Sequence, residues 1–118
     1  MADRLRTFQE FWPFYLGEHS LPATRAIHFV GTTLAFLDLG CGIATRDARF
    51  FLAAPVSAYA CAWVSHFFIE KNRPATFTYP LWSLIGDFKM WAYMATGKIG
   101  PELARHNVVP KAALRPSR

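Results

Sequence analysis

The feature that most constrains this chain is a run of twenty residues, Phe50 to Ile69, without Asp, Glu, Lys or Arg. As a helix rising about 1.5 Å per residue, the run would span the roughly 30 Å hydrocarbon core of a bilayer. A second segment, residues 26–45, has the same length and is interrupted only by His28 and Asp38. The link between them, residues 46–49, is short and charged. We therefore expect the two segments to form a transmembrane hairpin.

The composition agrees with a membrane protein. Hydrophobic residues make up 53% of the 118 residues and charged residues 18%, against roughly 45–50% and about 25% in ordinary soluble domains. These values exclude a disordered chain and a coiled coil. The two cysteines cannot form a disulfide framework. A soluble helical domain that buries both segments stays the alternative, because Pro55 and several glycines interrupt the apolar runs.

The net charge of +5 comes from basic residues near the chain ends and in two short links, while the middle of the chain has few charged residues. This pattern suits an anionic membrane surface better than a nucleic acid, which would require a basic face on the folded part. If residues 26–69 form a hairpin, both ends of the chain share the side with more basic residues, which we expect to be cytoplasmic. On that side lie Arg4, Arg6, Arg25, Lys71 and Arg73, against Arg46 and Arg49 in the link. The membrane would be the cell membrane of a bacterium or the endoplasmic reticulum of a eukaryote.

The fold class predicted is all-α, a single domain of about four helices over residues 1–99. Asp3 can cap the first helix, Ser20 and Pro22 can open the second, and Asp47 can cap the third. The fourth helix begins near Pro80 and ends by residue 97. Residues 100–118 are polar and basic, and we expect them to form a loosely ordered tail.

Ionisable side chains in apolar segments are costly, so each needs a partner or a task. His66 and Glu70 are four residues apart, which places both on one face of an α-helix and within reach of a common ion. Imidazole and carboxylate together suit iron, manganese or zinc. His19 and His28 lie near the membrane boundary to which an antiparallel third helix would return His66. All four residues could therefore converge at one depth.

Simpler interpretations stay open for each residue. His66 and Glu70 could be an ordinary helical pair, His19 a polar turn residue, and His28 a helix residue bonded to a carbonyl. Asp38 lies about 15 Å along the helix from His28 and is expected to be structural. The protein could instead be a non-enzymatic scaffold that interacts with lipid, or a transport subunit with His28, Asp38 and His66 as a proton relay.

Two segments resemble the motifs of a known family of small membrane proteins, domain of unknown function 962. The first is Tyr15-Leu-Gly-Glu-His19-Ser-Leu-Pro-Ala-Thr-Arg-Ala-Ile-His28-Phe-Val-Gly-Thr-Thr33, and the second is Ser65-His66-Phe-Phe-Ile-Glu70-Lys-Asn-Arg-Pro-Ala75. They occur in the family's order and spacing, and the resemblance covers roughly residues 8–99. Glu18 stands where the characterised branch of the family has a further histidine.

The resemblance implies an iron-dependent dioxygenase that shortens 2-hydroxy fatty acids by one carbon in the membrane. It implies that Fe(II) is held by His19, His28 and His66, with Glu70 as a fourth ligand or as a partner that orients one. Dioxygen and a membrane-borne 2-hydroxy fatty acid would be the reactants, and Arg25 or Arg73 could pair with the substrate carboxylate. The chain could act as a homo-oligomer.

Overall fold

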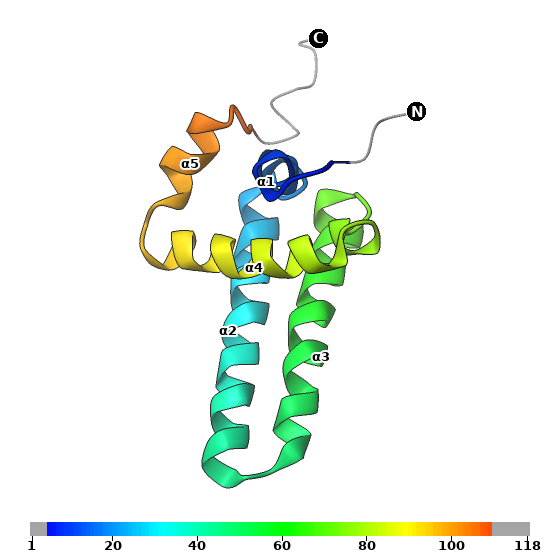
Figure 1. Ribbon diagram of the computed structural model, residues 1–118, viewed down its shortest axis with the longest axis vertical. Helices are drawn as coiled ribbons and strands as arrows, with labels where there is room; N and C mark the ends of the chain where they lie inside the picture. Colours follow the sequence, from blue (N-terminus) through cyan, green and yellow to red (C-terminus); the bar gives the residue numbers. More distant parts are fainter. Residues whose placement is uncertain (1–4, 110–118) are drawn as a thin grey trace.

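The computed structural model describes residues 5–109, and the regular structure in this range is entirely helical. Two long antiparallel helices form a hairpin, and shorter helices gather at one end of it (Figure 1). The predicted all-α class is therefore confirmed. The elements in order are α1 (Phe8–Gly17), α2 (Pro22–Thr45), α3 (Ala48–Val64), the π-helix η1 (Ser65–Glu70), the 3-10 turn η2 (Ala75–Phe77), α4 (Pro80–Ala95) and α5 (Ile99–Arg105).

The hairpin consists of α2 on one side and α3 with η1 on the other. Asp47 caps α3 as predicted, because its side chain accepts a hydrogen bond from the backbone N–H of Arg49. The helices approach closely at Gly31, where a Cβ atom would lie 2.7 Å from the Cβ of Cys61. Both arms, Pro22–Thr45 and Ala48–Glu70, are long and apolar enough to cross a membrane.

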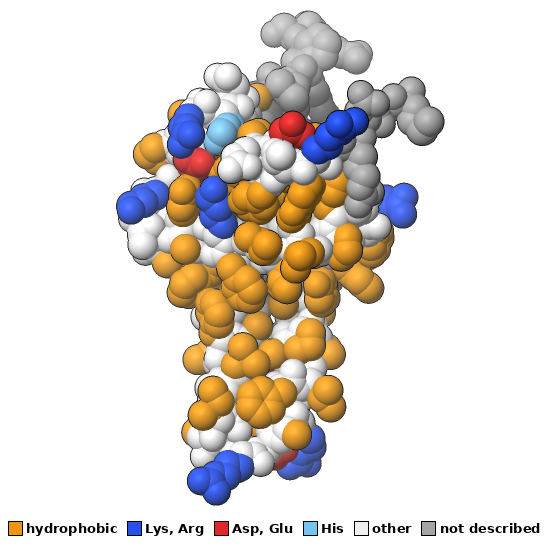
Figure 2. Space-filling model, in the orientation of Figure 1, with side chains coloured by type: hydrophobic (Ala, Val, Ile, Leu, Met, Phe, Trp, Pro, Cys, Tyr) orange, Lys and Arg blue, Asp and Glu red, His pale blue; other side chains and the backbone are white. Residues whose placement is uncertain are grey.

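The surface of the hairpin is unusually apolar for a protein in water. The side chains of Ile43, Leu52 and Val56 are 71%, 72% and 68% exposed. Orange hydrophobic side chains cover the projecting part of the hairpin, and basic side chains appear at its tip and around the opposite end (Figure 2). Only 22% of the most apolar window of each arm is buried within the protein, whereas a core helix of a soluble domain would be mostly buried.

The other helices form a head at the open end of the hairpin. Helix α4 runs across the two arms, and α1 lies beyond it (Figure 1). Their shared core is largely aromatic and contains Phe11, Trp12, Tyr15, Leu16, Ala75 and Met90. Trp91 on α4 donates its indole N–H to Thr33 on α2 at 2.9 Å, which ties the head to the hairpin.

The first helix begins later than predicted, whereas the second ends where its apolar segment ends. Helix α1 begins at Phe8 with Thr7 as its cap, because the Thr7 hydroxyl accepts the Glu10 N–H; Asp3 lies outside the described residues. Helix α2 contains Gly40 and Gly42 and ends at Thr45, where the apolar segment also ends, since a glycine inside a packed helix costs only about 1 kcal/mol.

Part of the segment expected to be a loose tail is helical. Residues 99–105 form α5, which packs on α1 because the Trp12 indole donates to the buried Glu102 carboxylate at 2.7 Å. This buried contact joins residues far apart in sequence, so the local composition gave no sign of it. The expectation for residues 110–118 concerns positions outside the described residues.

Candidate metal centre

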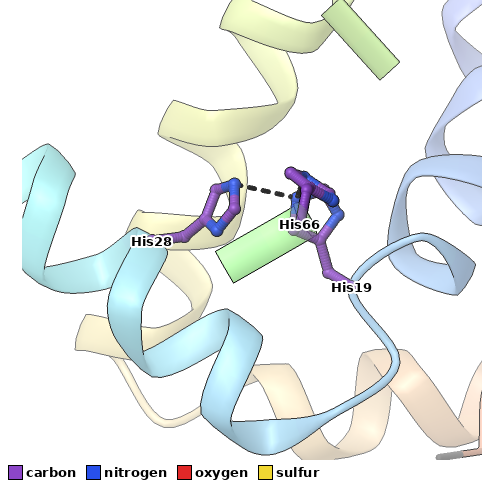
Figure 3. Close-up of side chains that lie close together, drawn as sticks. All are labelled: His19, His28 and His66. Carbon is purple, nitrogen blue, oxygen red and sulfur yellow. Dashed lines mark hydrogen bonds between the residues drawn. The ribbon is translucent and has the colours of Figure 1, made fainter. Parts of the chain in front are cut away.

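Three buried histidines from three different elements meet where the head joins the hairpin. His19 lies in the turn after α1, His28 is in the second turn of α2, and His66 is in η1. Their rings point toward one another (Figure 3). The exposed fractions of the three residues are 1%, 5% and 2%. The convergence expected from the hairpin topology is therefore present for the histidines.

The ring nitrogens are close enough to share one ion. Nε2 of His19 lies 3.1 Å from Nε2 of His28 and 3.1 Å from Nε2 of His66. One ligand atom from each ring can be chosen so that all three lie within 4.8 Å of one another. Among the described residues, this is the group of side chains with metal-binding geometry.

The other nitrogen of each ring faces a hydrogen-bond acceptor. Nδ1 of His19 lies 2.7 Å from the carbonyl oxygen of Tyr15, and Nδ1 of His28 lies 3.1 Å from that of Thr24. Nδ1 of His66 lies 2.6 Å from the side-chain oxygen of Asn72. A carbonyl oxygen cannot donate, so each Nδ1 must carry the hydrogen in these contacts. Each Nε2 is then left with a lone pair.

This donor set fits a transition-metal ion. Lone pairs that face one another at 3.1 Å repel unless a cation lies between them. With metal–nitrogen bonds of about 2.1 Å, two nitrogens at right angles around an ion lie about 3.0 Å apart. Neutral imidazoles suit iron and zinc. His19, His28 and His66 are therefore the residues that would hold the ion.

Burial favours the neutral form of His19, which is the form that metal binding requires. Burial, followed by the nearby rings of His28 and His66, lowers the pKa of His19 well below its ordinary value. The ring of Tyr15 stacks on His19 at 4.1 Å between centroids, and its hydroxyl donates to Asp87. Burial raises the pKa of Asp87 to about 7, although the Tyr15 hydrogen bond acts in the opposite direction.

The Glu70 carboxylate does not belong to the histidine cluster, although its spacing of four residues from His66 predicted that the two would lie together. Its carboxylate is 1% exposed and faces the beginning of α2. It accepts hydrogen bonds from the Ser20 N–H (3.2 Å), the Ser20 hydroxyl (2.5 Å), the Leu21 N–H (3.1 Å) and the Thr24 hydroxyl (2.6 Å). Glu70 therefore caps α2 from another helix, and Ser20 does not cap it as predicted.

The π-helix explains why the spacing argument for Glu70 failed. Residues 65–70 are wound with i→i+5 hydrogen bonds rather than i→i+4, so positions 66 and 70 do not stack as they would on an α-helix. The segment ends at Lys71, whose φ of 65° is left-handed. That reversal brings Asn72 back to His66, since the Asn72 N–H bonds to the carbonyl of His66 at 2.9 Å.

The remaining predicted residues lie outside the centre. One guanidinium nitrogen of Arg25 donates to the carbonyls of His19 and Ser20, at 2.8 and 3.0 Å. The guanidinium of Arg73 lies over the ring of Phe77. Neither side chain lines the cavity beside the histidines. Asp38 accepts a hydrogen bond from Ser57 across the hairpin at 2.8 Å, which agrees with its expected structural role.

Three polar neighbours of the histidines were not predicted from the sequence. Asn72 orients His66, and the Ser65 hydroxyl lies 3.0 Å from Nδ1 of His28. Ser83, on α4, lines the cavity beside the rings. Asn72 stood inside the second motif and could have been singled out there. Nothing in the local sequence of α4 distinguishes Ser83 from an ordinary helix residue.

The fold and the centre together define a small helical protein with an apolar hairpin and a buried site of three neutral histidines. Residues 5–99 match the family model described as 2-hydroxy-palmitic acid dioxygenase Mpo1-like. The chain therefore belongs to that family, as the resemblance of its two motifs implied. No curated protein and no solved structure showed a significant match to it.

Proposed function

We propose that this protein is an Fe(II)-dependent dioxygenase that acts on 2-hydroxy fatty acids within a membrane and shortens them by one carbon. The observation that carries the proposal is the convergence of three Nε2 lone pairs in a buried cavity. The family to which the chain belongs supplies the reaction class. The apolar hairpin supports an acyl substrate that reaches the site from the lipid phase.

Each part of the site has a definable task. His19, His28 and His66 would hold the ion through Nε2, and the acceptors at their Nδ1 atoms fix the ring orientations. The bound iron would supply the activation of dioxygen and a coordination site for the substrate's 2-hydroxyl and carboxylate. The aromatic head excludes water, and Glu70 keeps η1 fixed against the start of α2.

Iron content is the direct test. The full chain, purified anaerobically in detergent, is expected to contain about one iron per protein, and His66→Ala should contain none because two imidazoles hold Fe(II) weakly. His19→Ala and His28→Ala should behave in the same way. His106→Ala is the matched control, since His106 bonds to Glu102 on α5 and lies away from the centre.

Oxygen consumption then tests the reaction. The parent should consume oxygen with 2-hydroxypalmitate and not with palmitate, while each single histidine variant should be inactive. Double histidine variants should be no worse than single ones, because ligands of one ion act as a unit. A parent protein that binds no metal would support the non-enzymatic scaffold instead. If one histidine proves dispensable for iron, the three-histidine centre is wrong.

A further inference from the structure

One buried hydroxyl beside the histidines has no hydrogen-bond partner within the described chain. Ser83 is 4% exposed, and its Oγ is buried without a partner. It lines a cavity of about 20 Å³ together with His19, His28 and His66. Buried hydroxyls are nearly always bonded, since an unpaired one loses its hydration without compensation. An unpaired hydroxyl in the wall of a cavity therefore indicates a ligand that bonds to it.

A larger cavity of about 220 Å³ adjoins the first one. Tyr59 and Asp87 line both spaces, so the two meet at these side chains. The larger cavity lies between α2, α3 and α4, and most of its wall is apolar. Its walls include Ala35, Phe36, Leu39, Phe51, Leu84 and Phe88.

The lining residues show how far the larger cavity extends along α2. Leu39 is eleven residues beyond His28 on α2, which is about 16 Å along the helix axis. Phe51 lines the cavity from α3, and its ring lies against α2 at Gly42, where an added Cβ atom would lie 3.0 Å from the ring. The two cavities together form an apolar groove with a chamber that contains the three histidines at one end.

We propose that these two cavities form one binding site for a single-chain acyl acid. Ser83 Oγ donates a hydrogen bond to the carboxylate or 2-hydroxyl beside the histidines. The hydrocarbon tail passes Tyr59 and Asp87 and lies in the groove toward Leu39 and Phe51. The class of ligand rests on the proposed function, whereas the location of its head and tail rests on the two cavities.

A membrane phospholipid would bring the same hydrocarbon chemistry but does not match the chamber that contains the histidines. A space of about 20 Å³ accepts one or two water-sized groups, which suits a hydroxyl or a carboxylate oxygen. A phosphoglycerol head group is much larger. The experiment must therefore distinguish a groove that binds a fatty acid from a groove that is filled by a bilayer lipid.

Photolabelling tests the position of the tail. The full chain is placed in phosphatidylcholine nanodiscs under anaerobic conditions with a 2-hydroxy fatty acid that carries a diazirine near its terminal carbon. Adducts should concentrate on Leu39, Phe51 and Ala54. Excess 2-hydroxypalmitate should suppress them, and added phosphatidylcholine should not. Adducts spread over the outer faces, at Leu37 and Val56, or equal suppression by phosphatidylcholine, would overturn the proposal.

Groove length is tested by a matched pair of substitutions on α2. Leu39→Trp fills the far end of the groove and should weaken binding of 2-hydroxypalmitate about tenfold or more, while a 2-hydroxy acid of about half the chain length is unaffected. Leu37→Trp makes the same change on the outer surface, where Leu37 is 59% exposed. It should alter the binding of neither the long nor the short 2-hydroxy acid. Equal effects of the two substitutions would contradict the groove.

Ser83 is tested by comparing binding with stability. Ser83→Ala should weaken binding of 2-hydroxypalmitate about tenfold or more, as expected for a hydrogen bond to a charged group. Its melting temperature should not fall, because the hydroxyl has no partner in the protein alone. Ser57→Ala, which loses a bond to Asp38, should show the opposite pattern. A lower melting temperature with unchanged binding in Ser83→Ala would show a purely structural hydroxyl.

The labelling needs neither iron nor turnover, so its outcome is separable from the proposed function. If the protein binds iron and consumes oxygen but labels on its outer faces, the dioxygenase stands and the groove is wrong. If labelling concentrates in the groove of a protein that never binds iron, the groove stands and the protein is a fatty-acid-binding protein.

Discussion

The centre depends on which nitrogen of each imidazole carries the hydrogen. Tyr15, Thr24 and Asn72 each present an oxygen acceptor to an Nδ1 atom. Two of these acceptors are backbone carbonyls four residues before the histidine, so the helical backbone itself selects the tautomer. At His66 the acceptor is a side chain, and at His28 the Ser65 hydroxyl adds a side-chain contact to the backbone one. The three histidines could be identified from sequence because ionisable residues in or beside apolar segments are rare, and Asn72 stands in the second motif, whereas Ser83 matters only through its position in space.

Glu70→Gln should retain iron and lose stability. The carboxylate accepts four hydrogen bonds at the start of α2, and a glutamine amide would turn an N–H₂ group toward some of these donors. The free energy of unfolding should fall by about 1–3 kcal/mol. Thermal unfolding in detergent and iron analysis of the same sample measure both effects.

The exposed Glu10 provides the control for that substitution, because Glu10→Gln should change neither quantity. If Glu70→Gln loses iron as completely as His66→Ala, Glu70 is a direct ligand. The centre would then be of the type with histidines and one carboxylate.

Asp87→Asn should make the stability of the protein less sensitive to a rise in pH from about 4 to about 7. An unfolded aspartate releases its proton near pH 4, but the folded Asp87 holds it up to about pH 7. The folded state therefore binds more protons between these values, so this group lowers stability as the pH rises from about 4 to about 7. Asparagine has no such titration and can still accept the Tyr15 hydroxyl.

Melting temperatures of the parent and Asp87→Asn at about pH 5 and about pH 8 measure this difference. The melting temperature of the variant, relative to that of the parent, should be higher at about pH 8 than at about pH 5. Other groups whose proton binding differs between the folded and unfolded states act on both proteins and cancel in the comparison. A constant difference at both pH values would show that Asp87 does not hold its proton in the folded protein.

At the scale of helices, hydrophobic runs predicted the hairpin and its boundaries well. The Asp47 cap and the start of α4 at Pro80 follow from local chemistry that a sequence displays. The π-helix could not be predicted, because its winding depends on Glu70 being held by α2 and Asn72 being held by Glu18 and His66. Helix α5 could not be predicted for the same reason, since the Trp12–Glu102 contact that holds it is not local.

Gly31→Ala should separate the two arms of the hairpin and damage the centre. The added Cβ would lie 2.7 Å from the Cβ of Cys61, and Gly31 is only three residues from His28. We expect a lower melting temperature and lower iron content. Cys61→Gly in the same protein should restore both in part, because it removes the opposing atom.

Gly40→Ala is the control on the same helix. Nothing lies within 4 Å of the Cβ that it would add, and alanine favours a helix by about 1 kcal/mol over glycine. Its melting temperature should stay the same or rise. A Gly31→Ala protein that is equally stable would show that the arms do not pack as closely as described.

At the scale of the molecule, the distribution of side chains predicts integration into a bilayer. The projecting arms expose about 70% of Ile43, Leu52 and Val56, and basic side chains lie at the tip, including the exposed Arg49. The chain should remain in the membrane fraction after carbonate extraction, as judged by immunoblotting. Quantitative release into the soluble fraction would contradict this prediction.

Orientation is a second property of the whole molecule. The head carries more basic residues than the tip of the hairpin, so the head and both chain ends are expected on the cytoplasmic side. Single cysteines, introduced at Arg46 and at Arg105 in a background without Cys41 and Cys61, should react with an impermeant thiol reagent from opposite sides. Labelling of Arg105→Cys from outside would reverse the topology.

The crossing of α4 over the hairpin has a consequence for depth. Phe36 on α2 still touches Phe88 on α4, and only nine residues, about 14 Å of helix, continue from there to Thr45. That is about half of a bilayer core of roughly 30 Å. For the tip to reach the far surface, α4 must sink below the head groups or the bilayer must thin around it. In the first case the histidines lie inside the leaflet on the side of the head. A fatty acid would then reach the centre by lateral movement within that leaflet, without leaving the lipid.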